Sequence, residues 1–311
     1  MIYYLVTAKH LYTMRDFLAG PGQKLDERVE VVTYKDFLRL KFLPFGTFVF
    51  SDVDRMSGSQ SMELLKRWKT IRAAGAPTLN HPVLSLRRYD LLRKLHEEGI
   101  NRFDAYMMTE HRKPKRFPVF VRSAFDHEGA KTELLADQAA LDAELARLRA
   151  EPVWPGDKVI VEYEHYADAQ GVYKKYAGFR VADRFVPRQV LAATKWVVKR
   201  PELQTPELAA EEAAYLDANP HRDLLMRVFD LANIDYGRID YAVIDGEVQV
   251  FEINSNPTII GRTSGAALRS DDSPRGPAYR KAIGRYIEAM EAIDVPDDGR
   301  RITFDEPTGA H

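Results

Sequence analysis

The chain of 311 residues contains no cysteine, which excludes a disulfide framework, a thiolate nucleophile and a cysteine zinc site. It also has no run approaching the ~20 apolar residues that a membrane helix needs. The first apolar stretch, residues 3–6, is too short for the hydrophobic core of a secretion signal. The sequence therefore predicts a cytoplasmic protein without a membrane partner.

An excess of charge of one sign is missing too, because 45 basic residues balance 46 acidic ones and leave a net charge of −1. That balance gives no reason to expect a nucleic-acid partner. The length suits two domains that share one interface, or one large domain with a small appendage, and a 45% share of hydrophobic residues is enough for a sizeable core. The chain has no internal repeat and no low-complexity tract, and its sequence leaves a homo-oligomer open.

The first 80 residues combine strand and helix patterns. Short runs rich in β-branched and aromatic residues indicate buried strands at 2–7, 29–34 and 47–51. They alternate with helical patterns such as 61–74, which predicts a small parallel α/β domain over 1–80. No G-x-G-x-x-G follows the first strand, so we expect no dinucleotide site there. The turn-rich segment PTLNHP (77–82) marks the end of this domain.

A hairpin pattern over residues 238–257, RIDYAVIDGEVQVFEINSNP, carries the clearest chemistry. Two strand-like runs flank an Asp-Gly pair, which is a strong local hairpin signal. Asp240 lies on the first strand, while Glu252 and Asn254 lie on the second. Because Glu252 and Asn254 are two residues apart, their side chains share one face of the strand.

The loop length decides whether Asp240 joins that face. A two-residue turn pairs Ile244 with Glu247, puts Asp240 opposite Phe251 and points Glu252 to the other side. A three-residue loop brings Asp240 diagonal to Glu252 on one face. We predict this odd loop or an equivalent bulge.

Two carboxylates and an amide oxygen on one face form a set of hard oxygen donors, which suits Mg²⁺, with Mn²⁺ as the alternative. Asp240, Glu252 and Asn254 are therefore the predicted metal ligands. A surface hairpin with solvated acids is the competing interpretation. Against it, Glu252 interrupts a strongly apolar run over 248–253.

The segment FEINSNP (251–257) closely resembles the E-x-N segment of ATP-grasp enzymes. The spacing from Asp to Glu looks like that of the branch containing ribosomal-protein glutamate ligases and glutathione synthetase-like enzymes. The resemblance implies an α/β protein whose ATP-grasp fold, over 81–295, has two sheet-containing lobes that clasp ATP, with a lid lobe at about 115–165. The polar residues 296–311 are expected to form a frayed tail.

The resemblance also implies an adenine site. The strand over 157–165 is similar to the family's hinge strand, and we expect it to offer an exposed edge to the base. Glu162 and the backbone near Tyr163 are the predicted adenine contacts. Glu164, with Asp168 as a weaker choice, is the predicted contact for the ribose hydroxyls.

Phosphate groups need cations and backbone N–H groups. The segment FPVFVR (117–122) matches a family strand that usually ends in lysine, so Arg122 is the predicted phosphate contact, with a planar fork in place of a point charge. The glycine-rich lid of the family is reduced here to one glycine, so Gly129 and His127 are the predicted lid contacts. In the family, a cation on the middle strands reaches the γ-phosphate, and Arg188 and then Lys175 are our choices.

The resemblance implies a carboxylate–amine ligase that acts through an acyl phosphate. Such an enzyme needs no protein nucleophile, and catalysis rests on positioning and charge neutralisation. Arg262 is placed in the segment that lines the acceptor side in the family, where it is predicted to clamp a substrate carboxylate. The substrates are a small-molecule or peptide carboxylate and an amine-type acceptor. An ATP-grasp kinase and a nucleotide-binding module without ligase chemistry are the alternatives.

Overall fold

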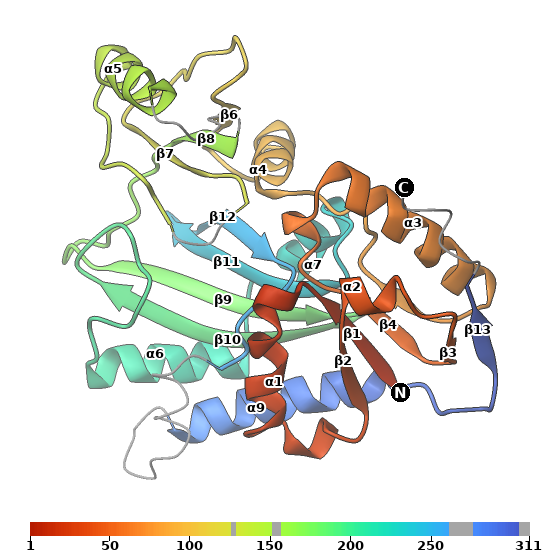
Figure 1. The fold of residues 1–311 in the computed structure, drawn as a ribbon. Helices are drawn as coiled ribbons and strands as arrows, with labels where there is room; N and C mark the ends of the chain where they lie inside the picture. Colours follow the sequence, from red (N-terminus) through yellow and green to blue (C-terminus); the bar gives the residue numbers. More distant parts are fainter. Residues whose placement is uncertain (126–128, 151–156, 261–275, 305–311) are drawn as a thin grey trace.

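The computed structural model describes residues 1–125, 129–150, 157–260 and 276–304, and in this part of the chain four β-sheets are flanked by helices (Figure 1). In Figure 1 the N-terminal unit lies on the right, a large antiparallel sheet lies in the centre, and a small lobe lies at the upper left. None of the described helices is both long enough and apolar enough to cross a membrane. The architecture is of the predicted α/β class.

The N-terminal unit is built on a parallel sheet in the order β2-β1-β4-β5. Its inner strand β1 carries only aliphatic and tyrosine side chains, as expected for a strand that is buried on both faces. The strands of this unit are β1 (Ile2–Val6), β2 (Val29–Thr33), β4 (Thr47–Phe50) and β5 (Thr78–Leu79). Its helices are η1 (Ala8–His10), α1 (Tyr12–Leu18), η2 (Gln23–Leu25), α2 (Tyr34–Phe37), η3 (Val53–Arg55) and α3 (Gly58–Ala73). The predicted parallel α/β unit is confirmed.

The central sheet is antiparallel in the order β10-β9-β11-β12. Its strands are β9 (Tyr173–Val181), β10 (Arg184–Ala193), β11 (Tyr236–Ile244) and β12 (Glu247–Asn254). The helices α6 (Pro206–Asp217), α7 (Arg222–Leu231) and α9 (Gly276–Ala292) pack against it. Tyr241 and Val250 share one buried cluster with Phe229 of α7, whereas Phe179 and Tyr236 share another with Tyr4 of β1. The sheet is therefore anchored both to its own helices and to the N-terminal unit.

The small lobe is a three-stranded sheet in the order β6-β8-β7. Its elements are β6 (Ala105–Met107), β7 (Val119–Ser123), β8 (Lys158–Glu162) and α5 (Gln138–Arg149), and α4 (Arg88–Glu97) lies beneath it. Helix α5 buries Leu141, Leu145 and Leu148 against β7, as their helical spacing predicts. The expected exposed edge at 157–165 is wrong for β8, because β6 and β7 pair with its two sides.

The segment after α9 is partly ordered. Strand β13 (Arg301–Thr303) pairs with β3 (Phe42–Pro44), so the expectation of a frayed tail is wrong for these residues. The reason is apolar burial: Ile302 and Phe304 are only 2% and 3% exposed in the core of the N-terminal unit. The guanidinium of Arg67 lies 4.3 Å from the ring centroid of Phe304 and adds a cation–π contact.

Asn80, at the end of the first predicted domain, joins the two large sheets. It is 2% exposed and left-handed, with φ of 64°. Its Nδ2 donates to the carbonyls of Phe50 (3.0 Å) and Tyr236 (2.9 Å), and its Oδ1 accepts from the N–H groups of Asp235 (2.8 Å) and Tyr236 (2.9 Å). One side chain therefore satisfies four backbone groups, three of them in buried hydrogen bonds.

Asn80→Ala is expected to lower the free energy of unfolding by about 3–5 kcal/mol, because each lost buried hydrogen bond costs about 1 kcal/mol and leaves a polar group unsatisfied. Chemical denaturation checks this. Asn80→Gly is the matched variant, since glycine accepts a positive φ without strain. A glycine variant as stable as the native chain would assign the loss to the backbone rather than to the four bonds.

Candidate functional site

The β11–β12 hairpin closes with a two-residue turn. Asp245 and Gly246 both have positive φ, 50° and 80°, and Ile244 pairs with Glu247. The predicted three-residue loop is therefore wrong, but the equivalent bulge is present. The register shifts beyond Tyr241, so that Asp240 pairs directly with Glu252.

Phe251 is the extra residue of this bulge, and its side chain has a place to pack. Its ring lies 5.3 Å from that of Tyr166 and 6.3 Å from that of Phe103, centroid to centroid. Because side chains alternate along a strand, one inserted residue moves Glu252 and Asn254 onto the face of Asp240. The bulge thus creates the shared face that the metal prediction requires.

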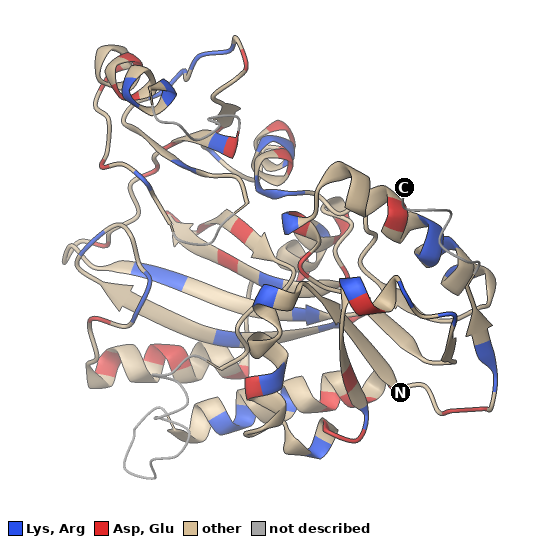
Figure 2. Ribbon diagram, in the orientation of Figure 1, with Lys and Arg blue, Asp and Glu red and all other residues tan. Residues whose placement is uncertain are grey.

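Asp240 is 2% exposed and held by two cations. Arg238 Nε donates to its Oδ1 at 2.7 Å, and Lys175 Nζ donates to its Oδ2 at 3.0 Å. Burial acts to raise the pKa of the Asp240 carboxyl, but Arg238 and Lys175 outweigh it and hold that pKa below its usual value. Asp240 is therefore an anion at neutral pH. Figure 2 shows acidic residues on β11 and β12 beside basic residues on β9.

Glu252 is held by two arginines from outside the central sheet. Arg88 Nη2 of α4 lies 2.6 Å from its Oε2, and Arg122 Nη2 of β7 lies 2.9 Å from the same atom. Arg88 also donates Nη1 to the carbonyl of Ser123 at 2.7 Å. Sequence reasoning missed both Arg88 and Arg238, although Arg238 lies inside the hairpin motif.

A cavity opens between the small lobe and the central sheet and reaches both carboxylates. Its empty space is about 820 Å³, which includes space open to solvent. Its apolar and aromatic wall comprises Leu92, Phe103, Phe120, Val161, Tyr163, Tyr166, Trp196, Val197, Val198 and Phe251. Its charged lining comprises Arg122, Glu162, Glu164, Lys175, Lys199, Asp240 and Glu252. The cavity thus combines a flat apolar slot with a charged end.

Among the predicted nucleotide contacts, the cavity lining includes Arg122, Gly129, Glu162, Tyr163, Glu164 and Lys175. Gly129 has φ of 96°, and a Cβ there would lie 2.7 Å from Lys199 Cε, so this position favours glycine. His127 and Arg262 lie outside the described residues.

Two predicted residues lie apart from the described lining. Arg188 is 3% exposed, donates Nε to the carbonyl of Ile259 at 3.1 Å, and stacks 5.1 Å from the ring centroid of Tyr279. Asn254 is buried and pairs with Arg238 across strands β11 and β12. Its Oδ1 accepts from the N–H of Asn256 at 2.9 Å. That bond leaves a second lone pair on the amide oxygen.

The side-chain oxygens at this site suit Mg²⁺, provided that a bound molecule supplies the remaining oxygen ligands. In the described part of the chain no three His, Asp or Glu side chains gather into a metal cluster. A cation at Asp240 and Glu252 would therefore have two carboxylates, with Asn254 as the further protein oxygen. Mg²⁺ is commonly held in this way, by one or two carboxylates together with phosphates and waters.

Solved structures resemble this chain over nearly its whole length. A D-alanine–D-alanine ligase from Bacillus anthracis complexed with ATP matches with a TM-score of 0.53 at 14% identity, covering 94% of this chain and 97% of that one. A second structure of that ligase gives 0.51 at 13%, covering 94% and 98%. A RimK domain ATP-grasp protein from Sphaerobacter thermophilus gives 0.49 at 13%, covering 93% and 100%. No protein-family model and no curated protein matches the sequence. At these identities the likeness is one of fold.

Proposed function

We propose that this chain, which has the ATP-grasp fold, is an ATP- and Mg²⁺-dependent carboxylate–amine ligase. The observation that carries the proposal is the pair Asp240 and Glu252, placed opposite each other by a bulge at the charged end of an aromatic cavity. Four cations contact these two carboxylates, which leaves a local surplus of two positive charges. Such a surplus favours a polyanionic ligand.

We assign each part of the nucleotide to the part of the cavity whose side chains have matching chemistry. The adenine ring fits the aromatic slot, where Trp196 lies 4.9 Å from Phe120 and 5.6 Å from Tyr163, centroid to centroid. The phosphates extend to Arg122 and Lys175, whose charges pair with phosphate oxygens. Mg²⁺ held by Asp240, Glu252 and Asn254 would neutralise phosphate charge, and Mn²⁺ has the same donor preference.

In the proposed reaction an oxygen of the substrate carboxylate attacks the γ-phosphorus of ATP and ADP leaves. The amine then attacks the carbonyl carbon of the acyl phosphate, and phosphate leaves. Lys175, which lines the cavity and contacts Asp240, stabilises the charge that develops during transfer. We place it ahead of Arg188, which is buried against Tyr279 outside the described lining. Arg262 is retained as the proposed clamp for the substrate carboxylate.

Binding is tested by thermal unfolding with ATP and Mg²⁺, separately and together. Ligand at a hundredfold excess over its Kd is expected to stabilise the chain by about 2.7 kcal/mol. The combination should act more strongly than ATP alone, and EDTA should remove the difference, because Mg²⁺ would link the two carboxylates to the phosphate oxygens. No stabilisation by ATP under any condition would contradict the proposal.

Product analysis then separates the ligase from a kinase. ATP consumption is screened against pools of carboxylates and amines. A ligase consumes ATP fully only when both an acid and an amine are present, and it releases ADP, phosphate and an amide. A phosphorylated product that accumulates without an amine would replace the ligase proposal with a kinase.

A further inference from the structure

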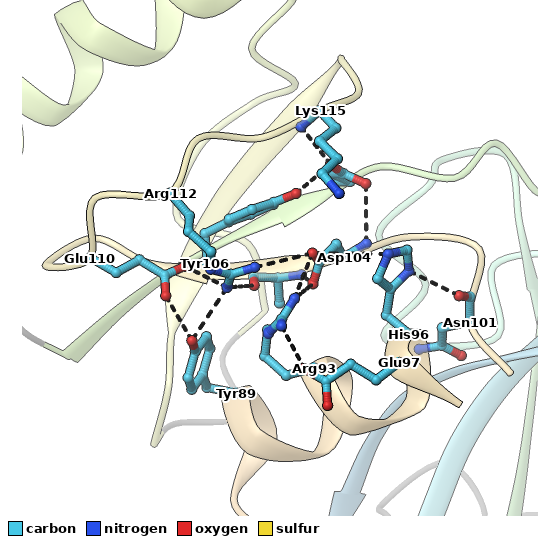
Figure 3. A network of polar contacts seen from close by, with 12 residues as sticks. Tyr89, Arg93, His96, Glu97, Asn101, Asp104, Tyr106, Glu110, Arg112 and Lys115 are labelled. Carbon is cyan, nitrogen blue, oxygen red and sulfur yellow. Dashed lines mark hydrogen bonds and ion pairs between the residues drawn. The ribbon is translucent and has the colours of Figure 1, made fainter. Parts of the chain in front are cut away.

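A dense polar network ties the small lobe to helix α4 (Figure 3). At its centre Asp104, 2% exposed, accepts from Arg93 Nη1 through both carboxylate oxygens at 2.7 Å. Arg112 lies 3.4 Å from Asp104, and His96 lies 4.0 Å from it. The residues surrounding Asp104 therefore favour its anion.

Glu162, at the end of β8, makes two hydrogen bonds with the backbone of Asp104. Its N–H donates to the Asp104 carbonyl at 3.0 Å, and its Oε2 accepts from the Asp104 N–H at 3.1 Å. Its Oε1 accepts from Tyr106 Oη (2.9 Å) and from the N–H groups of Lys115 (2.9 Å) and Arg116 (3.1 Å). The four donors use both oxygens of the carboxylate, with three on Oε1 and one on Oε2.

The wall of the cavity follows directly from this arrangement. Tyr163 and Glu164 come after Glu162 and line the slot. The N–H of Tyr163 donates to the carbonyl of Pro118 at 2.9 Å, and Arg116 forms an ion pair with Glu164. Glu162 binds the N–H of Arg116, so one carboxylate fixes both the end of β8 and the loop that holds Glu164.

We infer that Glu162 and Asp104 are positioning residues for the base end of the nucleotide site, rather than direct contacts to the base. The inference rests on the proposed function, because it concerns the same cavity. Asp104 acts from outside the described lining, because its backbone N–H and carbonyl bind Glu162. The Asp104 carboxylate holds that backbone in place by accepting from the Ala105 N–H at 2.7 Å and from Arg93. A base contact by the Glu162 carboxylate would have to share an oxygen with the donors already bound.

A positioning residue and a residue that contacts the base directly should affect the affinities for ATP and ITP differently. Kd is measured by calorimetry for ATP and for ITP, which lacks the 6-amino group, with Mg²⁺ and the full-length chain. Positioning predicts that Glu162→Gln and Asp104→Asn each weaken both nucleotides by about tenfold, as expected for one lost charge-assisted hydrogen bond. It also predicts that the ratio of the two Kd values stays constant. A change confined to ATP, or Asp104→Asn without effect, would overturn the inference.

The matched control is Glu97→Gln, which removes the other carboxylate on Arg93. Glu97 lies 2.6 Å from Arg93, but its side chain is 54% exposed. We expect nucleotide affinity within twofold of the native chain. Lost affinity in this variant would show that any disturbance of α4 suffices, and would remove the special role of Asp104.

Hydrogen exchange tests the inference without nucleotide, so it applies even if a variant folds poorly or the chain does not bind ATP. Hydrogen exchange at the Tyr163 amide of the free protein should accelerate at least about tenfold in Asp104→Asn, while Val250 on the central sheet stays unchanged. Equal acceleration at both amides indicates general destabilisation and contradicts positioning. If the native chain binds neither nucleotide while exchange changes as expected, the proposed function fails and the local role of Asp104 stands.

Discussion

Replacing Glu252 with glutamine is expected to lower ATP-dependent turnover by about a thousandfold or more, which corresponds to roughly 4 kcal/mol of transition-state stabilisation. The amide keeps the shape of the side chain but loses the charge. Glu252 lies directly opposite Asp240, so its loss removes half of the anionic charge available to a divalent ion. Turnover is measured as ADP release with saturating acid, amine and Mg²⁺.

The control for this variant lies on the same strand. Glu247→Gln removes a carboxylate that is 64% exposed and pairs with Arg102 at 2.8 Å, away from the cavity lining. An exposed ion pair contributes at most about 1 kcal/mol, so activity and stability should stay close to native. Activity retained in Glu252→Gln, with Mg²⁺ dependence unchanged, would refute the metal assignment.

Much of this hairpin could be predicted from the sequence. The Asp-Gly pair predicts a tight turn, and the interrupted apolar run identifies Glu252 as unusual. The register could not be read locally, because a bulge at Phe251 depends on the distant rings of Phe103 and Tyr166. The sequence shows only that some shift is needed if Asp240 and Glu252 are to share a face.

Contacts between residues that are far apart in the sequence could not be predicted from local patterns. Arg88 lies on a helix with several other basic residues, and nothing in its spacing shows that it reaches Glu252, 164 positions away. The sequence predicts the strand β8, but its pairing with β6 joins residues far apart in the chain. The position of Glu162 marks it as a candidate, whereas its four donors are set by tertiary contacts.

Arg88→Met is expected to be the most destabilising change at the site, lowering the free energy of unfolding by about 3–5 kcal/mol. The Arg88 side chain is 4% exposed, and it joins the Ser123 carbonyl at the end of β7 to Glu252 on β12. Methionine fills much of the volume but leaves the carbonyl without that donor and Glu252 with less compensating charge. Chemical denaturation, with ATP affinity measured on the folded fraction, checks both effects.

The double variant Arg88→Met/Glu252→Gln separates the energy of the Arg88–Glu252 ion pair from the contribution of Arg88 to the packing of α4. If the charge pair is the cause, the double variant should be more stable than the sum of the single losses predicts, by a coupling energy of about 1–3 kcal/mol. Strict additivity would instead assign the loss to the packing of Arg88 and its bond to Ser123.

Arg88→Lys tests the fork geometry, because a lysine keeps the charge but has no planar fork with which to hold Glu252 and the Ser123 carbonyl together. We therefore expect Arg88→Lys to recover part of the stability and little of the ATP affinity.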